Sequence, residues 1–191
     1  MSDLSPSKIR VWDLPTRVFH WVLALCLVGG RWSRFASFIY SPGTVLRYLR
    51  GQARADEHLD VGHNPLGSFS VFALLGFLAL QLATGLVADD EIANLGPLNR
   101  FVSGDTAKLA SGWHKEYGQW VLITLVVLHI AAILFYLLKK KHNLVRPMIV
   151  GDKPLPAGTP ASADGWAQRG LALLLLLICA AAAGWVFSLG G

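Results

Sequence analysis

The chain has 191 residues, of which 53% are hydrophobic and only 15% are charged, whereas a soluble domain usually has about 25% charged residues. This composition favours a small integral membrane protein with one main domain. The net charge of +5 does not indicate nucleic-acid binding, because the cations lie beside apolar segments, as they do at membrane surfaces. Cys26 and Cys179 both lie inside apolar runs, which argues against a disulfide framework and a cysteine-ligated metal.

Four apolar segments are candidates for membrane helices, which need roughly 20 residues each. The first, at 18–30, is short, although Asp13 and Pro15 resemble a helix start that would lengthen it upstream. The sequence therefore predicts the all-α class, as an integral membrane helical bundle of about four apolar helices. The other three segments are 66–88, 117–138 and 170–187.

The two ends of the chain differ from its middle. A signal peptide at 1–30 would fit the length of the apolar run, but that run opens with Phe19-His20-Trp21 and no A-x-A site follows. We therefore expect these residues to be retained. Residues 154–164 (PLPAGTPASAD) have the composition of a flexible linker. The predicted units are a membrane domain at 8–153, a linker at 154–168 and a C-terminal membrane helix at 169–191.

The charges of the connections predict which side of the membrane each one faces. Lys and Arg are in excess before residue 18, in 31–65 and in 139–169, whereas 89–116 has three cations and five acids. Cytoplasmic loops carry the Lys/Arg excess, so the first three should be inside and the fourth outside. One crossing at 18–30 cannot leave both of its flanks inside. Either this run does not cross the membrane completely, or its orientation conflicts with the charge rule, or the chain lacks a helix that its charges require.

Six histidines are the candidate functional residues. His58 and His142 lie in charged connections, where contact with solvent or lipid headgroups explains them. The other four lie in or beside apolar segments, where polar residues are costly and usually functional. They are His20, His63, His114 and His129.

His114 and His129 lie fifteen positions apart on one predicted helix, about 22 Å apart in height and within roughly 60° of the same face. An interhelical hydrogen bond would explain one lone histidine. Two imidazoles near opposite membrane surfaces suit the axial ligands of two stacked b-haems. A proton or ion relay is the alternative, but it would normally include intramembrane Asp or Glu, and the apolar segments contain neither.

The inner half of the membrane has a possible ligand pair. His20 and His129 both lie toward the predicted inner surface, and Arg17 could neutralise a haem propionate or contact a lipid headgroup. His114 belongs to the outer half, where the sequence has no other histidine. Small residues that would let helices pack around flat rings lie on both central helices: Gly67, Ala73, Gly76, Gly85, Gly118, Ala131 and Ala132.

Several segments of the chain form a recognisable set: VWDLPTRVFHW (11–21), GHNPLG (62–67), TGLVADDEI (84–92), WHKEYGQW (113–120) followed by LHIAAILFY (128–136), and NLVRPMIVG (143–151). Together they resemble the prokaryotic cytochrome b561 family, which includes the cytochrome b subunits of nickel-iron hydrogenases. The resemblance covers roughly residues 8–153.

The resemblance implies a four-helix core with two b-haems. One haem would be held by His20 and His129, and the other by His114 and a histidine of the second helix. This chain instead runs from Phe19-His20-Trp21 into GRWSRF (30–35), which resembles the exit of that second helix, so the helix and its histidine are missing. His63 is an imperfect substitute partner at the inner edge. Otherwise it caps a helix or lies near a propionate or a quinone.

The predicted function is that of a membrane b-type cytochrome. It would carry electrons through one or two haem b groups, between a quinone or a partner redox subunit and another carrier, rather than act as a stand-alone catalyst. It would be a multi-pass protein of the bacterial inner membrane, in contact with lipid. A haem-free anchoring subunit and a histidine-based proton or ion transporter are the alternatives.

Overall fold

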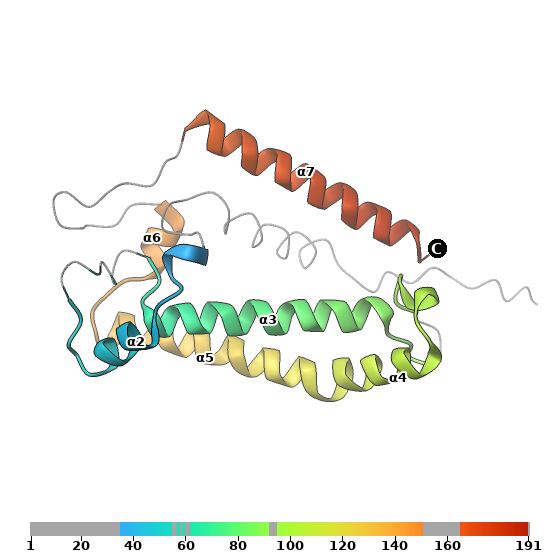
Figure 1. Ribbon diagram of the computed structural model, residues 1–191, viewed down its shortest axis with the longest axis horizontal. Helices are drawn as coiled ribbons and strands as arrows, with labels where there is room; N and C mark the ends of the chain where they lie inside the picture. Colours follow the sequence, from blue (N-terminus) through green and yellow to red (C-terminus); the bar gives the residue numbers. More distant parts are fainter. Residues whose placement is uncertain are drawn as a thin grey trace, which may run out of the picture.

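The computed structural model describes residues 35–54, 57, 59, 62–91, 95–150 and 165–190. All regular elements in these residues are helical, which confirms the predicted all-α class (Figure 1). The apolar run at 18–30 lies outside the described residues. In chain order the elements are η1 (Phe35–Ser37), α2 (Pro42–Leu49), α3 (Pro65–Val87), η3 (Asn99–Phe101), α4 (Gly104–Gly112), η4 (Trp113–Gly118), α5 (Gln119–Leu138), α6 (Val145–Val150) and α7 (Trp166–Ser188).

Three helical stretches of the described chain are long and apolar enough to cross a membrane: Pro65–Val87, Gly104–Leu138 and Trp166–Ser188. Their large apolar side chains are widely exposed, for example Phe69 at 75% and Phe187 at 75%. A water-soluble protein rarely leaves so much contiguous apolar surface uncovered. The chain is therefore a multi-pass membrane protein, with three of the expected four or so helices in its described part.

The central helix begins earlier than its apolar pattern predicts. The expected span was 117–138, but α4, η4 and α5 form one continuous helical stretch from Gly104 to Leu138. Its start is fixed by the side chain of Ser103, which accepts a hydrogen bond from the backbone N–H of Thr106 at 3.3 Å. Polar residues such as Lys108 continue the helix beyond its apolar part, so a hydropathy criterion misses them.

α3 and the α4–η4–α5 stretch lie side by side (Figure 1). The turn between them closes the C-terminal end of α3, where helices leave carbonyl groups without intrahelical partners. Leu98 N–H donates to the carbonyl of Leu86 at 2.8 Å, and Gly96 N–H donates to that of Ala88 at 2.8 Å. The side-chain amide of Asn99 donates to the carbonyl of Val87 at 2.9 Å. Three consecutive carbonyls are thus satisfied by one short turn.

A buried hydroxyl joins this turn to α4. Ser111 Oγ accepts from the backbone N–H of Asp89 at 2.8 Å and lies 2.8 Å from the carbonyl oxygens of Asp89 and Ala107. Ser111→Ala would leave the Asp89 N–H without this partner, so we expect a loss of about 1–3 kcal/mol in unfolding free energy. Thermal unfolding in detergent measures it. Ser188→Ala removes an exposed hydroxyl bonded within its own helix, and an equal loss there would contradict the prediction.

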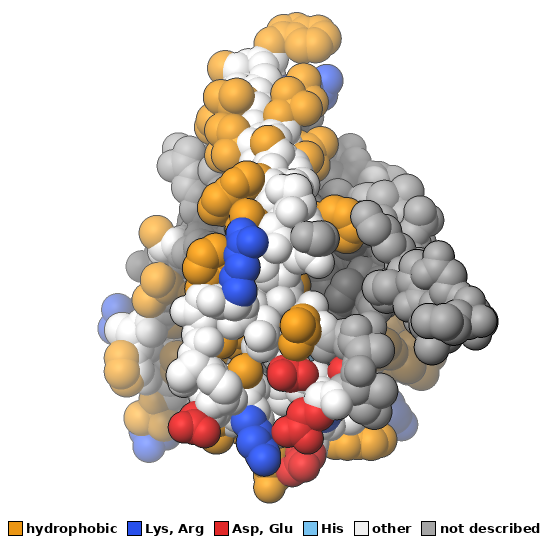
Figure 2. All heavy atoms as spheres, turned by 90° about the vertical axis from the view of Figure 1, so that its right-hand side faces the viewer, with side chains coloured by type: hydrophobic (Ala, Val, Ile, Leu, Met, Phe, Trp, Pro, Cys, Tyr) orange, Lys and Arg blue, Asp and Glu red, His pale blue; other side chains and the backbone are white. Residues whose placement is uncertain are grey.

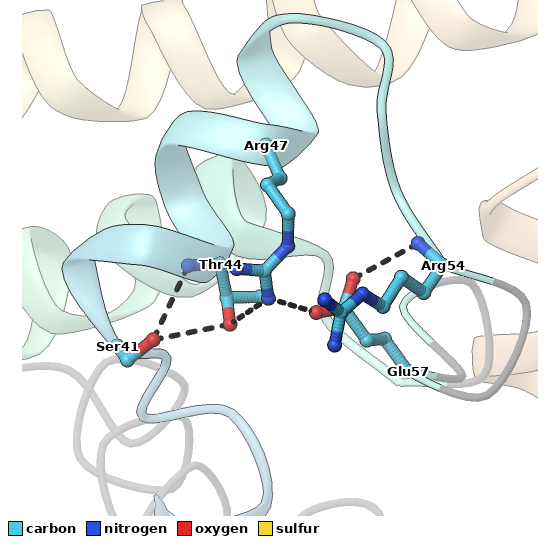
Figure 3. A network of polar contacts seen from close by, with 5 residues as sticks. All are labelled: Ser41, Thr44, Arg47, Arg54 and Glu57. Carbon is cyan, nitrogen blue, oxygen red and sulfur yellow. Dashed lines mark hydrogen bonds and ion pairs between the residues drawn. The ribbon is translucent and has the colours of Figure 1, made fainter.

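A polar network links α2 to the connection that precedes α3 (Figure 3). Ser41 caps α2 by accepting from the backbone N–H of Thr44 at 3.2 Å. Arg47 on α2 pairs with Glu57 and also donates to Thr44 Oγ1 at 3.1 Å. The backbone N–H of Arg54 donates to the second carboxylate oxygen of Glu57 at 3.0 Å. Both oxygens of Glu57 are therefore held.

This network predicts a titration that can be measured directly. The hydrogen bond from Arg47 and, next, that from the Arg54 backbone lower the pKa of Glu57 below its ordinary 4.5. Because the folded-state pKa is lowered, the stabilisation is present above the ordinary pKa and is lost as the pH falls through the folded-state value. Carboxyl NMR should show the Glu57 pKa rising toward its ordinary value in Arg47→Gln. Arg50→Gln, at the C-cap of the same helix, should leave the pKa of Glu57 unchanged; equal shifts in both variants would refute the assignment.

Candidate functional site

His129 lies on the side of α5 that faces α3. Its Nδ1 is 3.4 Å from Ser70 Oγ, near the start of α3. A hydroxyl can donate or accept, so this contact is compatible with either tautomer of the ring. When Nδ1 carries the proton and donates to Ser70, Nε2 keeps a lone pair that is free to bind a metal.

His114 is held by the other end of α3. Its Nδ1 lies 2.9 Å from the backbone carbonyl oxygen of Gln81 and 3.3 Å from Thr84 Oγ1. The side-chain amide of Gln81 donates to the backbone carbonyl of His114 at 3.0 Å. A Cβ at Gly85 would lie 2.7 Å from His114 Cε1, so only glycine allows the ring to come this close. The imidazole is therefore seated directly on the backbone of α3.

The π-helical turn η4, which contains His114, sets the angle between the two histidines. A π turn contributes one residue more than an α turn. The fifteen positions from His114 to His129 therefore rotate the chain as far as about fourteen α-helical steps would. The two side chains consequently point within about 40° of the same direction around the helix axis. Ser70 and Thr84 are also fourteen residues apart on α3. Both imidazoles consequently meet α3, each beside a hydroxyl.

The residues at these two positions fit a haem. Haem iron binds a neutral imidazole nitrogen, and the other ring nitrogen usually donates to a carbonyl or a carboxylate. His114 shows this pattern, with Nδ1 on the Gln81 carbonyl. His129 can adopt it through Ser70. Of the small residues singled out in the sequence, Gly85 and Gly118 receive neighbouring side chains, whereas a Cβ at Gly76 would meet nothing within 4 Å.

His63 lies just before α3, at the end where α3 starts. Its ring centroid is 5.1 Å from that of the fully buried Phe38, and its backbone carbonyl accepts from the Tyr40 hydroxyl at 2.6 Å. Burial and, secondarily, the nearby His129 lower the pKa of His63 below its ordinary 6.5, so the ring is neutral at pH 7. Its buried Nδ1 has no hydrogen-bond partner among the described residues. The helix cap is Asn64, which accepts from Gly67 N–H at 2.8 Å, so the expectation that His63 itself caps α3 is wrong.

The structure brings some predicted residues into contact with α3 and leaves others untested. His114 and His129 both meet α3, and His142 is exposed, as its charged surroundings predict. His20, Arg17 and His58 lie outside the described residues. The partners on α3 were missed by sequence analysis. A usable signal existed, because Ser70, Gln81 and Thr84 are three of the four polar residues of a largely apolar helix, the fourth being Ser68.

The end of the bundle beyond His114 is charged. Figure 2 shows acidic side chains gathered around lysines at this end. A hollow of about 300 Å³ lies at this end. Among the described residues, no cluster of three or more His, Cys, Asp or Glu is arranged to hold a metal ion. The hollow is lined by Asp89, Asp90, Glu91, Lys108, Ser111, Gly112, Lys115 and Glu116.

Comparison with known proteins gives one match. The family model described as prokaryotic cytochrome b561 matches residues 31–151. This range contains His63, His114 and His129 but not His20 or Arg17. No curated protein and no solved structure matches the chain.

Proposed function

The chain belongs to the prokaryotic cytochrome b561 family, and from this premise we propose that it transfers electrons through haem b between a quinone or a partner redox subunit and another carrier. Family membership supports a membrane b-type cytochrome with b-type haem. The observation that carries the proposal is the pair of imidazoles on one helix, each with its Nδ1 held by α3. The apolar segments at 18–30, 66–88, 117–138 and 170–187 contain no Asp or Glu, which disfavours the proton or ion relay.

The inner haem site has two candidate histidine ligands, whereas the outer site has one. His129 and His20 would be the two ligands of the inner haem, and Arg17 would neutralise a propionate. Ser70 supports this assignment because its hydroxyl can fix the His129 ring with Nε2 free. Two imidazoles saturate the iron and favour electron transfer over oxygen chemistry.

The outer site depends on His114. Its Nδ1 contact with a backbone carbonyl supports Nε2 as a ligand, but the charge pattern offers no second histidine in that half. His63 lies at the other end of α3, packed against the buried Phe38, so we propose that it contacts the inner haem edge or a quinone rather than pairing with His114. The expected haem content is one per chain, or two if another ligand completes the outer site.

The chain's own residues would provide ligation, orientation and an apolar surrounding. Bound haem b supplies reversible one-electron chemistry of the iron. Ser70 and Gln81 hold the rings so that the ligand nitrogens are not reorganised between oxidation states. The apolar side chains of α3 and α5 exclude water and keep the local dielectric low, which influences the reduction potential.

The charges at the two ends of α5 support an orientation. Lys139, Lys140 and Lys141 follow α5 directly and are exposed. The acidic end lies beyond His114 (Figure 2). By the positive-inside rule, the lysine end faces the cytoplasm and the acidic end faces outward across a bacterial inner membrane.

An absorption spectrum tests the proposal. The full chain, expressed with ample haem and purified in detergent, should show a reduced b-type band after dithionite, and haem quantification should give at least one haem per chain. Absence of the band would overturn the electron-transfer proposal and favour the haem-free anchoring subunit.

A further inference from the structure

Gln81 contacts His114 in two ways at once. Its backbone carbonyl oxygen lies 2.9 Å from His114 Nδ1, and its side-chain Nε2 donates to the backbone carbonyl of His114 at 3.0 Å. One residue of α3 therefore holds both the ring and the main chain of one residue of η4. Ser70 makes only a ring contact with His129.

The first contact decides the tautomer of His114. A backbone carbonyl can only accept, so the proton must be on Nδ1. Thr84 Oγ1 lies 3.3 Å from the same nitrogen. Its single proton is already directed at the carbonyls of Leu80 and Gln81, at 2.9 and 3.1 Å. Thr84 can therefore only accept from His114 as well, and in the neutral imidazole it is Nε2 that then carries the free lone pair.

The second contact stabilises the π turn. The widened turn of η4 presents the carbonyl of His114 to an external donor, and the Gln81 amide supplies it. Gly118 makes room for this side chain, because a Cβ there would lie 2.1 Å from Gln81 Oε1 and 2.9 Å from Trp113 Nε1. Without the π turn, His114 would rotate by about one residue, or roughly 100°, around the helix axis.

We propose that Gln81 is a positioning residue that fixes both the Nδ1–H tautomer and the helical phase of His114, so that Nε2 is presented as a metal ligand. The tautomer and the helical phase of His114 follow from its contacts with Gln81. The link to haem iron rests on the proposed function.

The test compares Gln81→Leu, which removes the side-chain donor but keeps the backbone carbonyl, with Gln119→Leu. Gln119 is exposed on the turn after η4, so it is a matched control for the same chemical change. The full-length protein, purified with its haem in lipid nanodiscs and reduced to a diamagnetic state, carries ¹⁵N-labelled histidine. His114→Gln assigns the His114 resonances.

The wild type should show His114 with a protonated Nδ1 and an unprotonated Nε2. Gln81→Leu should broaden or shift these resonances. Loss of the side-chain donor would let His114 turn away from the Gln81 backbone carbonyl, which weakens its Nδ1 hydrogen bond. A weaker Nδ1 hydrogen bond makes the ligand less basic, so the variant should also raise the midpoint potential of any haem bound at His114 and weaken retention of that haem roughly 10- to 100-fold. Gln119→Leu should change none of these.

The outcomes separate this inference from the proposed function. In one outcome, the wild type binds no haem at His114 but shows the Nδ1–H tautomer, and Gln81→Leu loses that tautomer. The inference about Gln81 would then stand, whereas the proposal of an outer haem would be wrong. A wild-type His114 protonated at Nε2 alone would overturn the inference. So would haem binding that responds equally to Gln81→Leu and Gln119→Leu. Since the wild-type tautomer is read without Gln81→Leu, poor folding of that variant does not remove the test.

Discussion

Replacing His129 by alanine should remove the inner haem and, with it, most of the reduced b-type signal. The change deletes an imidazole that is expected to bind iron directly, and methyl has no ligand atom to replace it. Ser70, which lies 3.4 Å from His129 Nδ1, would lose its partner but cannot substitute as a strong ligand. The haem content per chain, measured from the pyridine haemochrome, should fall by one equivalent.

His142→Ala is the matched control, because His142 is exposed beyond the end of α5. It should bind as much haem as the wild type. A reduced spectrum that survives His129→Ala unchanged would show that His129 is not a ligand. Added imidazole should partly restore the signal in His129→Ala if the cavity stays intact, which distinguishes loss of a ligand from loss of the fold.

Gly96→Ala should destabilise the whole helix pair. A Cβ at this position would lie 2.3 Å from the carbonyl oxygen of Leu86 and 2.6 Å from that of Gly85. Both neighbours are backbone atoms at the end of α3, so no side chain can move aside. The turn that satisfies the last carbonyls of α3 would have to open. We expect a loss on the order of 3 kcal/mol in unfolding free energy, measured by thermal unfolding in detergent.

Gly76→Ala, in the middle of α3, is the control. A Cβ there meets nothing within 4 Å, and alanine is favoured over glycine inside a helix by about 1 kcal/mol. Its stability should equal or exceed that of the wild type. Comparable losses of stability in both variants would mean that the close approach of Gly96 to the end of α3 is not the cause.

The long apolar helices were predictable because hydrophobic length alone determines what can cross a membrane. The spans expected at 66–88 and 170–187 agree with α3 and α7 to within a few residues. The start of the central helix was not predictable in the same way. Residues 104–116 are helical although polar, because a capping serine and contacts with α3 stabilise a stretch that hydropathy assigns to a connection.

The site was predictable only in part. An imidazole in an apolar segment is conspicuous, so His114 and His129 were identified from the sequence. Their partners Ser70 and Gln81 are ordinary polar residues, and their role depends on which side of α3 faces α5. The π turn left no periodic signal, because one extra residue changes the phase of a helix without changing its composition. The pairing of His20 with His129 remains a prediction.

The two contacts between α3 and the histidine helix also fix how far these helices can slide. Ser70 and Gln81 are eleven residues apart on α3, about 16 Å along its axis. A shift by one turn, about 5.4 Å, would break both contacts together. The height of both imidazoles relative to α3 is therefore set by one register, whereas their separation is set by the continuous helical stretch that carries them both. Redox groups bound at these two positions would therefore keep a constant separation, and with it a constant electronic coupling, while the surrounding lipid fluctuates.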